Sequence, residues 1–381
     1  MTTYHFLQLY WWTIVSLLAG ILVFLMFVQG GQTLIAGTAK NENQRKILLR
    51  IFGHKWELTF TTLVLVGGAL FASFPLYYST SFGGAYWLWI LILLSFVLQA
   101  VSYEFRSKEK NLLGSKTYDI FLIINGFAGT ILLGVAVASF FTGGNFAVDK
   151  MSLANSASTT ISYWTNDWKG LELIANGMNI LLGAVVFLAA RTLGLLYVIN
   201  QALKMDGDKD AEDLAQRAYS KLAVTSIAFV LTFVVFVLQV FMMTGYKVNT
   251  ADPSFNGITG EIFGEKYAYL HNMLDNPWVA AVFVAGVVLV LVSLYRVLRL
   301  RKSSFYMTGL GIVLAVFALL LCAGYGDTSF FHSNGDIQNS LTLYNSSSSL
   351  YTLKTMAYVS IAVPFVLLYI VYVWRKMTLK H

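Results

Sequence analysis

The 381-residue sequence is poor in charge, cysteine, histidine and proline. Only 12% of its residues are charged and 57% are hydrophobic, whereas an ordinary soluble domain has about 25% charged residues. A soluble fold of this length lacks the polar surface to cover so many apolar side chains, so the composition excludes soluble globular and disordered proteins. We therefore expect an all-α polytopic membrane protein, with room for eight to ten spanning helices of about 20 residues each.

The scarce cysteine and histidine limit the cofactors that the chain can hold. Cys322 is the single cysteine and can form no internal disulfide. The histidines lie near the ends of apolar runs or in polar segments, at His5, His54, His271, His332 and His381. A bis-histidine haem between spans needs imidazoles deep in apolar segments, so we expect this chain to ligate no haem. Patterns of the HExxH, CxxC, P-loop and GxGxxG kinds are also missing, and we expect no metal site.

Apolar runs predict nine spanning segments in a single transmembrane domain, residues 1–381. They cover residues 9–36, 56–78, 86–105, 118–141, 171–203, 222–246, 279–296, 306–325 and 355–374. Residues 1–10 contain no Lys or Arg and no small-residue cleavage site, so we expect the first span to be retained. Three longer loops, residues 142–170, 247–277 and 326–354, mix polar residues with aromatics. They are either covers over a partner or interfacial anchors.

Basic residues gather in alternate loops, which predicts the orientation in the membrane. Twenty of the 26 Lys and Arg fall within residues 40–55, 106–116, 204–221, 296–302 and 375–380. By the positive-inside rule these segments are cytoplasmic, so the N-terminus lies outside, the C-terminus lies inside, and the number of spans is odd. The net charge of +7 is thereby an orientation signal, and we expect no nucleic-acid partner.

Four ionisable residues lie in or at the ends of spans, where a charge is costly and is by default a functional hypothesis. Glu57 follows Trp56 at the start of the second span, and Glu104 ends the third. Each is either an interfacial carboxylate paired with a neighbouring base, Lys55 or Arg106, or part of a cytoplasmic proton path, since partial burial of a carboxylate favours proton relay.

The other two ionisable residues are Asp119 and Arg191. Asp119 stands at the mouth of the fourth span, where we expect it to complement the N-terminus of its helix. Arg191 lies within the fifth span and needs a counter-charge, carbonyl groups or an acidic group of a partner protein.

Several motifs together resemble subunit II of the cytochrome bd-type quinol oxidases. The resemblance is carried by Trp11-Trp12, the HKWE of residues 54–57, the GGALFASFP of residues 67–75, the VSYEFRSK of residues 101–108, Arg191-Thr192, the NSLTL of residues 339–343 with Ser346–Ser349, Pro364, and the WRKM of residues 374–377. The first hundred and last fifty residues carry most of the match. The middle of the chain matches in topology only.

The resemblance implies nine helices, arranged as two four-helix bundles (about residues 1–141 and 171–325) with a peripheral ninth helix at residues 355–374. It also implies a haem-bearing subunit I as partner, with haem b and haem d in that subunit, and a bacterial inner-membrane location. A small accessory subunit, bound lipid and a bound quinone are compatible with it. The role that it carries onto Glu57, and with it Glu104, is a cytoplasmic proton path, supported by Trp56, Arg106 and Arg191.

Three segments depart from the pattern of the family. The Asn and the acid or Gln that often follow the Trp-acid pair are replaced here by Leu58, Thr59 and Phe60. An Asp-Gly-x-Asp that is common in the family reads Gln29-Gly30-Gly31-Gln32 here, and an Arg of the third-span block is Gln99. These changes bear on any cation or quinone site at those positions. The alternative functions are a proton-coupled secondary transporter, which usually shows broken helices with charges near the midplane, and a purely structural scaffold.

Overall fold

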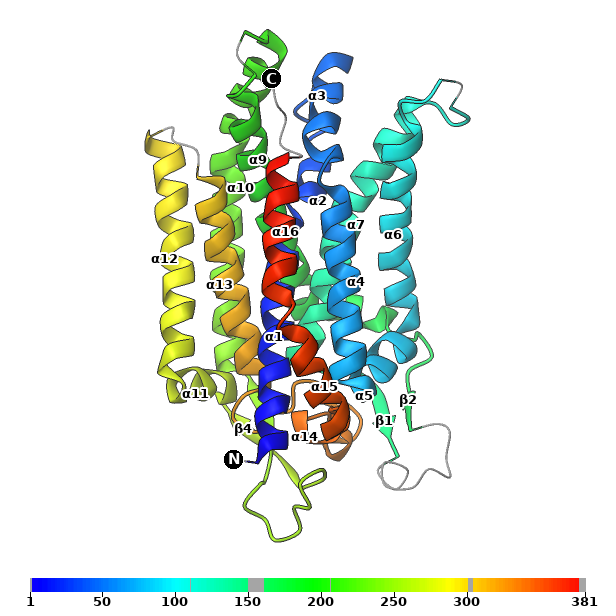
Figure 1. Cartoon of the computed structure of the whole chain (residues 1–381), viewed down its shortest axis with the longest axis vertical. Coiled ribbons are helices and arrows are strands. Elements are labelled where there is room, and N and C mark those ends of the chain that lie inside the picture. The colour runs from blue at the N-terminus through cyan, green and yellow to red at the C-terminus, as the bar shows by residue number, and fades with distance from the viewer. Residues whose placement is uncertain (1, 110, 150–160, 206, 301–303, 377–381) are drawn as a thin grey trace.

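The computed structural model describes residues 2–109, 111–149, 161–205, 207–300 and 304–376. Within these residues, eight helical segments are long and apolar enough to cross a membrane. They are α1 (Thr3–Leu25) continued by α2 (Phe27–Gln32), α3 (Glu42–Gly53) leading into α4 (Trp56–Ser73), α6 (Tyr86–Phe105), α7 (Ser115–Thr142), α9 (Gly177–Ala202), α10 (Lys209–Met242), α12 (Pro277–Leu300) and α13 (Phe305–Gly324). This confirms the all-α polytopic fold (Figure 1).

Two predicted spans have different boundaries because polar residues cap the helices. The fifth predicted span begins with a 3₁₀ turn, Leu171–Ala175, after which the side chain of Asn176 accepts hydrogen bonds from the first amides of α9. In α10, Asp208 caps a helix that begins 13 residues before the predicted span. The carboxylates of Asp210 and Glu212 lie in its first turn, where they complement the helix dipole.

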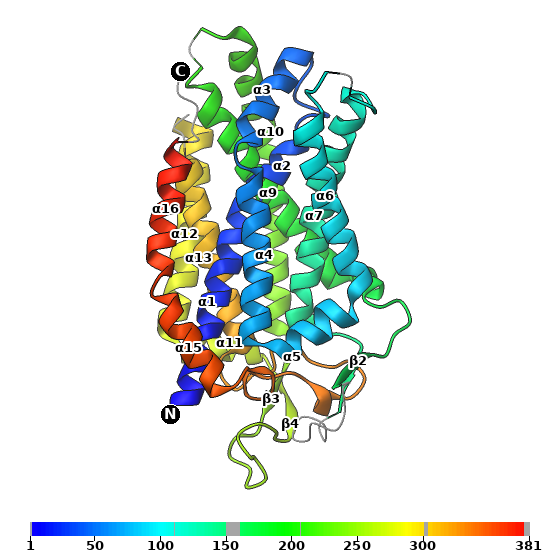
Figure 2. The ribbon, with the colours of Figure 1, turned by 45° about the vertical axis from the view of Figure 1, so that its right-hand side comes forward.

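The ninth predicted span is divided into two helices, α15 (Leu350–Ser360) and α16 (Val363–Lys376). Pro364 explains the break, since a proline has no amide hydrogen to continue the helical hydrogen bonds. Figures 1 and 2 show α16 on the outside of the molecule, near α4 and α13.

The core centres on α9, which packs against α2, α7 and α10 and also touches α1 and α13. Close approach depends on glycine: a Cβ on Gly30 would lie 2.1 Å from the backbone of Ala190, and one on Gly134 would lie 2.5 Å from the Cα of Gly183. Helices from both predicted bundles therefore share one hydrophobic core. The division into two bundles stays a prediction.

The three long loops pack together as a cap at one end of the molecule (Figure 1). Two hairpins form there, β1 (Phe146–Val148) with β2 (Ser162–Trp164), and β3 (Thr244–Val248) with β4 (Ile262–Lys266). The third loop joins them: Gln338 exchanges two hydrogen bonds with the backbone of Ile262, of 2.8 and 3.0 Å, and Ser333 donates to the carbonyl of Phe146. In the described residues the loops thus cover the ends of the helices. The cap also contains α11 (Ala268–Asp275), the short 3₁₀ turn Ile337–Asn339 and α14 (Leu343–Ser346).

The paired tryptophans near the N-terminus tie the two ends of the chain together. The indole of Trp11 donates to the carbonyl of Leu353 in α15, at 3.1 Å, and that of Trp12 donates to the carbonyl of Leu320 in α13, at 3.0 Å. Both indoles are buried with their single donor satisfied. The motif therefore positions α15 and α13 on α1.

Candidate functional site

The candidate residues lie at the end opposite the cap, where α4 and α7 begin and α6 ends (Figure 1). Trp56, in the first turn of α4, stacks on Tyr103 of α6 with ring centroids 6.0 Å apart and an angle of 11° between the planes. The hydroxyl of Tyr103 in turn accepts a hydrogen bond of 3.3 Å from Gln32. This stack fixes the N-terminus of α4, and with it the position of Glu57.

Glu57 is exposed, and its carboxylate has no hydrogen bond or ion pair within the described part of the chain. Lys55, the base expected to pair with Glu57, contacts other groups. Its ammonium group is buried, donates to the carbonyl of Trp374 at 3.0 Å, and lies 4.3 Å from the centre of the Trp374 ring. The pairing of Glu57 with Lys55 is therefore absent from the structure.

Glu104 is also exposed, and it pairs with Lys108 one turn later on the same helix end. Arg106 was the base expected to pair with it. No hydrogen-bonded chain in the described residues joins Glu104 to Glu57. A path that uses both carboxylates therefore needs water or groups of another chain.

Arg106 is the centre of a buried ion cluster. Its Nε donates to one oxygen of Asp119 at 2.6 Å and its Nη2 to the other at 3.1 Å, and Nη2 also donates to Glu42 at 3.0 Å. The side chains of Arg106 and Asp119 are only 4% and 9% exposed. This cluster fixes the starts of α3 and α7 to the end of α6. Asp119 thus neutralises a buried guanidinium, a role that its position in the sequence did not indicate, and Glu42 was missed because it lies 64 residues from Arg106.

Arg191 is half-buried, and its Nη1 donates to the hydroxyl of Thr33, just after α2. The sequence left three alternatives for its partner: a counter-charge, carbonyl groups or an acidic group of a partner protein, the last of which stays a prediction. Within the described residues the partner is a hydroxyl, so the positive charge has no opposing carboxylate in direct contact.

Buried amides lie behind the Trp56–Tyr103 stack. Gln29 donates to Gln99 at 3.3 Å, and Asn125 donates to Ser95 at 3.4 Å. Four buried polar atoms here have no hydrogen-bond partner among the described residues: Gln29 Oε1, Gln32 Oε1, Gln99 Nε2 and Asn125 Oδ1. Buried polar atoms are nearly always hydrogen-bonded, and water satisfies those that the protein does not. The arrangement therefore suits a hydrated interior between α2, α6 and α7.

A separate apolar cavity of about 340 Å³ lies in the middle of the molecule. Side chains of α1, α4, α7, α9, α10, α12 and α13 line it, among them Trp12, Leu63, Phe140, Val186, Phe233 and Ile312. Ser16 also lines it, and its buried hydroxyl has no hydrogen-bond partner in the described residues. Such a space suits an elongated apolar molecule.

The four histidines that the structure describes lie at the ends of the spans or in the cap. His5 lies in the first turn of α1 and stacks on Tyr344, and His54 lies between α3 and α4. His271 pairs with Glu265 in the cap, where His332 is also buried. His381 lies outside the described residues, among which no group of three or more His, Cys, Asp or Glu could hold a metal ion.

Comparison with known proteins decides the family. The family whose sequence model matches residues 7–377 is described as cytochrome bd terminal oxidase subunit II. The chain belongs to this family.

Relatives of this subunit II chain carry the same description. It is 28% identical over 392 aligned positions to cytochrome bd-I ubiquinol oxidase subunit 2 of Escherichia coli K12, covering 99% of this chain and 96% of that one. It is 26% identical to cytochrome bd ubiquinol oxidase subunit 2 of Bacillus subtilis 168, covering 88% and 86%. These relatives are subunits of oxygen-reducing respiratory oxidases, so the membership favours an oxidase subunit over a secondary transporter.

The subunit II fold is also that of a solved oxidase. The structure of the bd oxidase from Geobacillus thermodenitrificans superposes with a TM-score of 0.66 over 98% of each chain, at 14% sequence identity. At that identity the likeness concerns the fold alone.

Two of the three departures from the family pattern, at residues 29–32 and at Gln99, lie close together in this subunit II. Gln29 and Gln99 form one hydrogen bond, and Gln32 is bonded to Tyr103. All three are neutral amides, of which Gln29 and Gln99 bond each other and Gln32 bonds a tyrosine hydroxyl.

Proposed function

We propose that this chain is the subunit II of a quinol-oxidising, oxygen-reducing complex in a bacterial inner membrane, that it stabilises a haem-bearing subunit I, and that Glu57 takes up protons from the cytoplasm. Haem b and haem d belong to subunit I in this proposal. The observation that carries the proton role is the contrast among the carboxylates: Asp119, Glu42 and Glu104 each engage a base, whereas Glu57 stands exposed on a helix fixed by the Trp56 stack.

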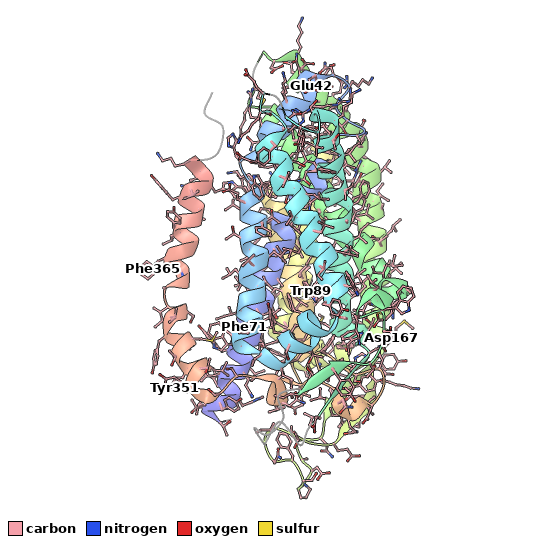
Figure 3. The ribbon with its side chains drawn as sticks, turned by 90° about the vertical axis from the view of Figure 1, so that its right-hand side faces the viewer. Glu42, Phe71, Trp89, Asp167, Tyr351 and Phe365 are labelled. Atoms are coloured by element: carbon pink, nitrogen blue, oxygen red, sulfur yellow. The ribbon has the colours of Figure 1, made fainter. Side chains whose placement is uncertain are left out.

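The face that carries Glu57 also suits contact with subunit I. α4 is the least buried of the spans and exposes Val64, Leu65 and Phe71. α15 and α16 add apolar groups on the outside of the molecule, where Figure 3 shows Tyr351 and Phe365 pointing outward. A helix that is apolar on its exposed sides needs lipid or a protein partner around it. Docking of subunit I against α4 and α16 would bury Glu57 at the interface.

The cytoplasmic side is assigned to the end that bears Glu57. Lys46 of α3, Lys209 at the start of α10 and Arg299 near the end of α12 lie at this end, as do Lys40 and Lys108 in the connections before α3 and after α6. The positive-inside rule then places the cap and the start of α1 on the outer side. Protons taken up at Glu57 would come from the cytoplasm, and the Trp56–Tyr103 stack lies beside the buried amides described above. Glu104, with its own base, would attract protons at the surface of the same region.

The apolar cavity is the proposed place for a bound quinone. Its walls match an isoprenoid chain, and the free hydroxyl of Ser16 offers one hydrogen bond to a carbonyl oxygen. Ala19→Phe, which fills the cavity, is expected to abolish quinone extracted from the purified complex at normal haem content. Ala251→Phe, in an exposed outer loop, is the control. Unchanged quinone in Ala19→Phe would place the quinone elsewhere.

Oxygen consumption by the purified complex tests the main proposal. Glu57→Gln is expected to reduce turnover with quinol by about tenfold or more, in line with the loss of a positioned proton-transfer group, while the haem spectrum is unchanged. Glu109→Gln, an exposed carboxylate near the same surface, is the matched control. If this chain is purified from its native membrane without a haem-bearing partner, the oxidase assignment itself is contradicted.

A further inference from the structure

Three cationic side chains from α9 and α10 converge on the turn that follows α2. Arg191 donates to the hydroxyl of Thr33. Lys221 donates to the carbonyl of Gly37 and to the hydroxyl of Thr38, the latter at 3.2 Å. Arg217 donates to the carbonyl of Thr38 at 3.3 Å. Three positively charged side chains thus contact the same turn.

The charge in this cluster is unbalanced. Arg217 pairs with Asp213 at 3.2 Å, but neither Arg191 nor Lys221 meets a carboxylate in the part of the chain that the structure describes. The two also lie close enough for their charges to repel each other. Arg191 uses one of its five donors on Thr33 and is half-buried in a span. Such a pair is stabilised by an anion that accepts the remaining hydrogen bonds.

The cluster lies at the boundary of the apolar part of α10. From Leu222 to Met242 the helix has 21 residues, about 31 Å at 1.5 Å per residue, which matches the hydrocarbon thickness of a bilayer. Lys221 therefore lies at the level of the lipid headgroups. Arg191 starts deeper on α9 and reaches toward the same level, as long basic side chains do near the interface.

An exposed apolar surface continues from the cations toward the middle of the membrane. From Leu182 to Ile199, α9 is buried except for Ala184, Phe187, Leu188 and Arg191, which form one partly exposed strip at helical spacing. Phe187 stacks on Phe127 of α7, with centroids 4.8 Å apart. On α10, the same side as Lys221 exposes Val224, Ile227 and Leu231. Figure 2 shows α2, α9 and α10 next to one another at this end of the molecule.

We propose that Arg191 and Lys221 bind the phosphate of an anionic phospholipid of the cytoplasmic leaflet, whose acyl chains lie along the exposed strips of α9 and α10. The positive pair supplies the charge complementarity for a phosphodiester, and Arg191 keeps four of its five hydrogen-bond donors and Lys221 one of its three for the phosphate oxygens. A free phosphate ion would use the same cations but would gain nothing from the apolar strips. A carboxylate of subunit I is the other group that could neutralise them.

The test uses the delipidated oxidase complex, titrated in detergent with phosphatidylglycerol and followed by native mass spectrometry and thermal unfolding. Arg191→Gln or Lys221→Gln is expected to weaken binding of one phosphatidylglycerol about fivefold each, and the double variant about thirtyfold, because each basic residue near the surface contributes a similar electrostatic attraction. Arg299→Gln, an exposed cation of α12, is the control and is expected to bind as the parent does. Lys221→Arg keeps the charge and is expected to retain the lipid.

Three outcomes would overturn the proposal. If zwitterionic phosphatidylcholine binds as tightly as phosphatidylglycerol, the site does not recognise the charge of the lipid. Full displacement of the lipid by millimolar inorganic phosphate would identify a soluble anion as the ligand. Loss of haem content and of subunit I in Arg191→Gln, with lipid binding unchanged in Lys221→Gln, would assign the cations to the subunit interface. None of these results depends on whether Glu57 conducts protons.

Discussion

Gln29 on α2 donates a hydrogen bond of 3.3 Å to Gln99 on α6, and both side chains are fully buried. Their remaining amide atoms, Gln29 Oε1 and Gln99 Nε2, have no partner within the described residues. Gln29 and Gln99, which are 70 residues apart in the chain, thus form a neutral contact between α2 and α6. One polar atom of each side chain has no partner in that contact or elsewhere in the described residues. A neutral pair costs less to bury than an ion pair. A charge introduced at one of the two positions therefore needs an opposite charge at the other.

Gln29→Asp is expected to lower the stability of the complex by about 3 kcal/mol or more, because it leaves an uncompensated charge in the interior. Gln99→Arg alone is expected to do the same. The double variant restores a pair and should recover most of the loss, seen as a large favourable coupling in the thermal unfolding midpoints. Additive losses in the double variant would show that the two side chains are not coupled.

Asp119→Asn tests the buried ion cluster around Arg106. The change leaves the guanidinium with only the half-exposed carboxylate of Glu42, and removing one partner of a buried pair costs about 3–5 kcal/mol. The expected result is a lower unfolding temperature and less assembled complex at equal expression. Asp213→Asn, whose partner Arg217 is nearer the surface, is the control and is expected to change stability by less than about 1 kcal/mol. Equal effects of the two substitutions would contradict the central role of Arg106.

His332 makes the outer cap sensitive to acid. Burial lowers the pKa of His332 to about 4, below its value of about 6.5 in an unfolded chain. The neutral side chain therefore stabilises the cap fully above pH 6.5, and this stability is lost as the pH falls from 6.5 to about 4, by ~3 kcal/mol in total. Hydrogen exchange of the β3–β4 hairpin, whose Tyr246 lies against the imidazole, is expected to accelerate over that range.

The matching variants separate His332 from other acid effects. His332→Gln is expected to flatten the pH dependence of exchange, whereas His54→Gln, at an exposed position between α3 and α4 at the opposite end of the molecule, is expected to keep it. If both variants keep the parent profile, another group is responsible.

Gly134→Ala tests the close crossing of α7 and α9. An added Cβ would meet the backbone of Gly183 and Leu182 at 2.5–2.9 Å, which forces the helices apart. We expect a loss of about 1–3 kcal/mol, measured as a lower unfolding midpoint. Gly177→Ala, where nothing lies within 4 Å, is expected to be neutral.

Much of the fold follows from apolar periodicity and charge, because a bilayer requires long apolar helices. The sequence predicted one span where the structure has α15 and α16, because the apolar run continues through the break between them. Pro364 interrupts that run and could have indicated the break. The ends of α9 and α10 were displaced because Asn176 and Asp208 start helices that composition alone does not delimit.

The candidate site was predictable in position but not in its pairings. Glu57, Glu104 and Arg106 do lie at one end of the molecule, as the loop charges implied. The base nearest in sequence is not the partner of either Glu57 or Glu104. Lys55 instead contacts Trp374, and Arg106 pairs with Asp119 and Glu42. These contacts join helices that are distant in the chain, and no spacing rule encodes them.

The most direct test of the account is proton uptake by the fully reduced complex when it reacts with oxygen, followed with a pH indicator in a single turnover. We predict that Glu57→Gln slows proton uptake by about tenfold or more, at unchanged haem content, whereas Glu109→Gln matches the parent. Uptake at the parent rate in an intact Glu57→Gln complex would contradict the assignment of Glu57 as the proton-uptake residue.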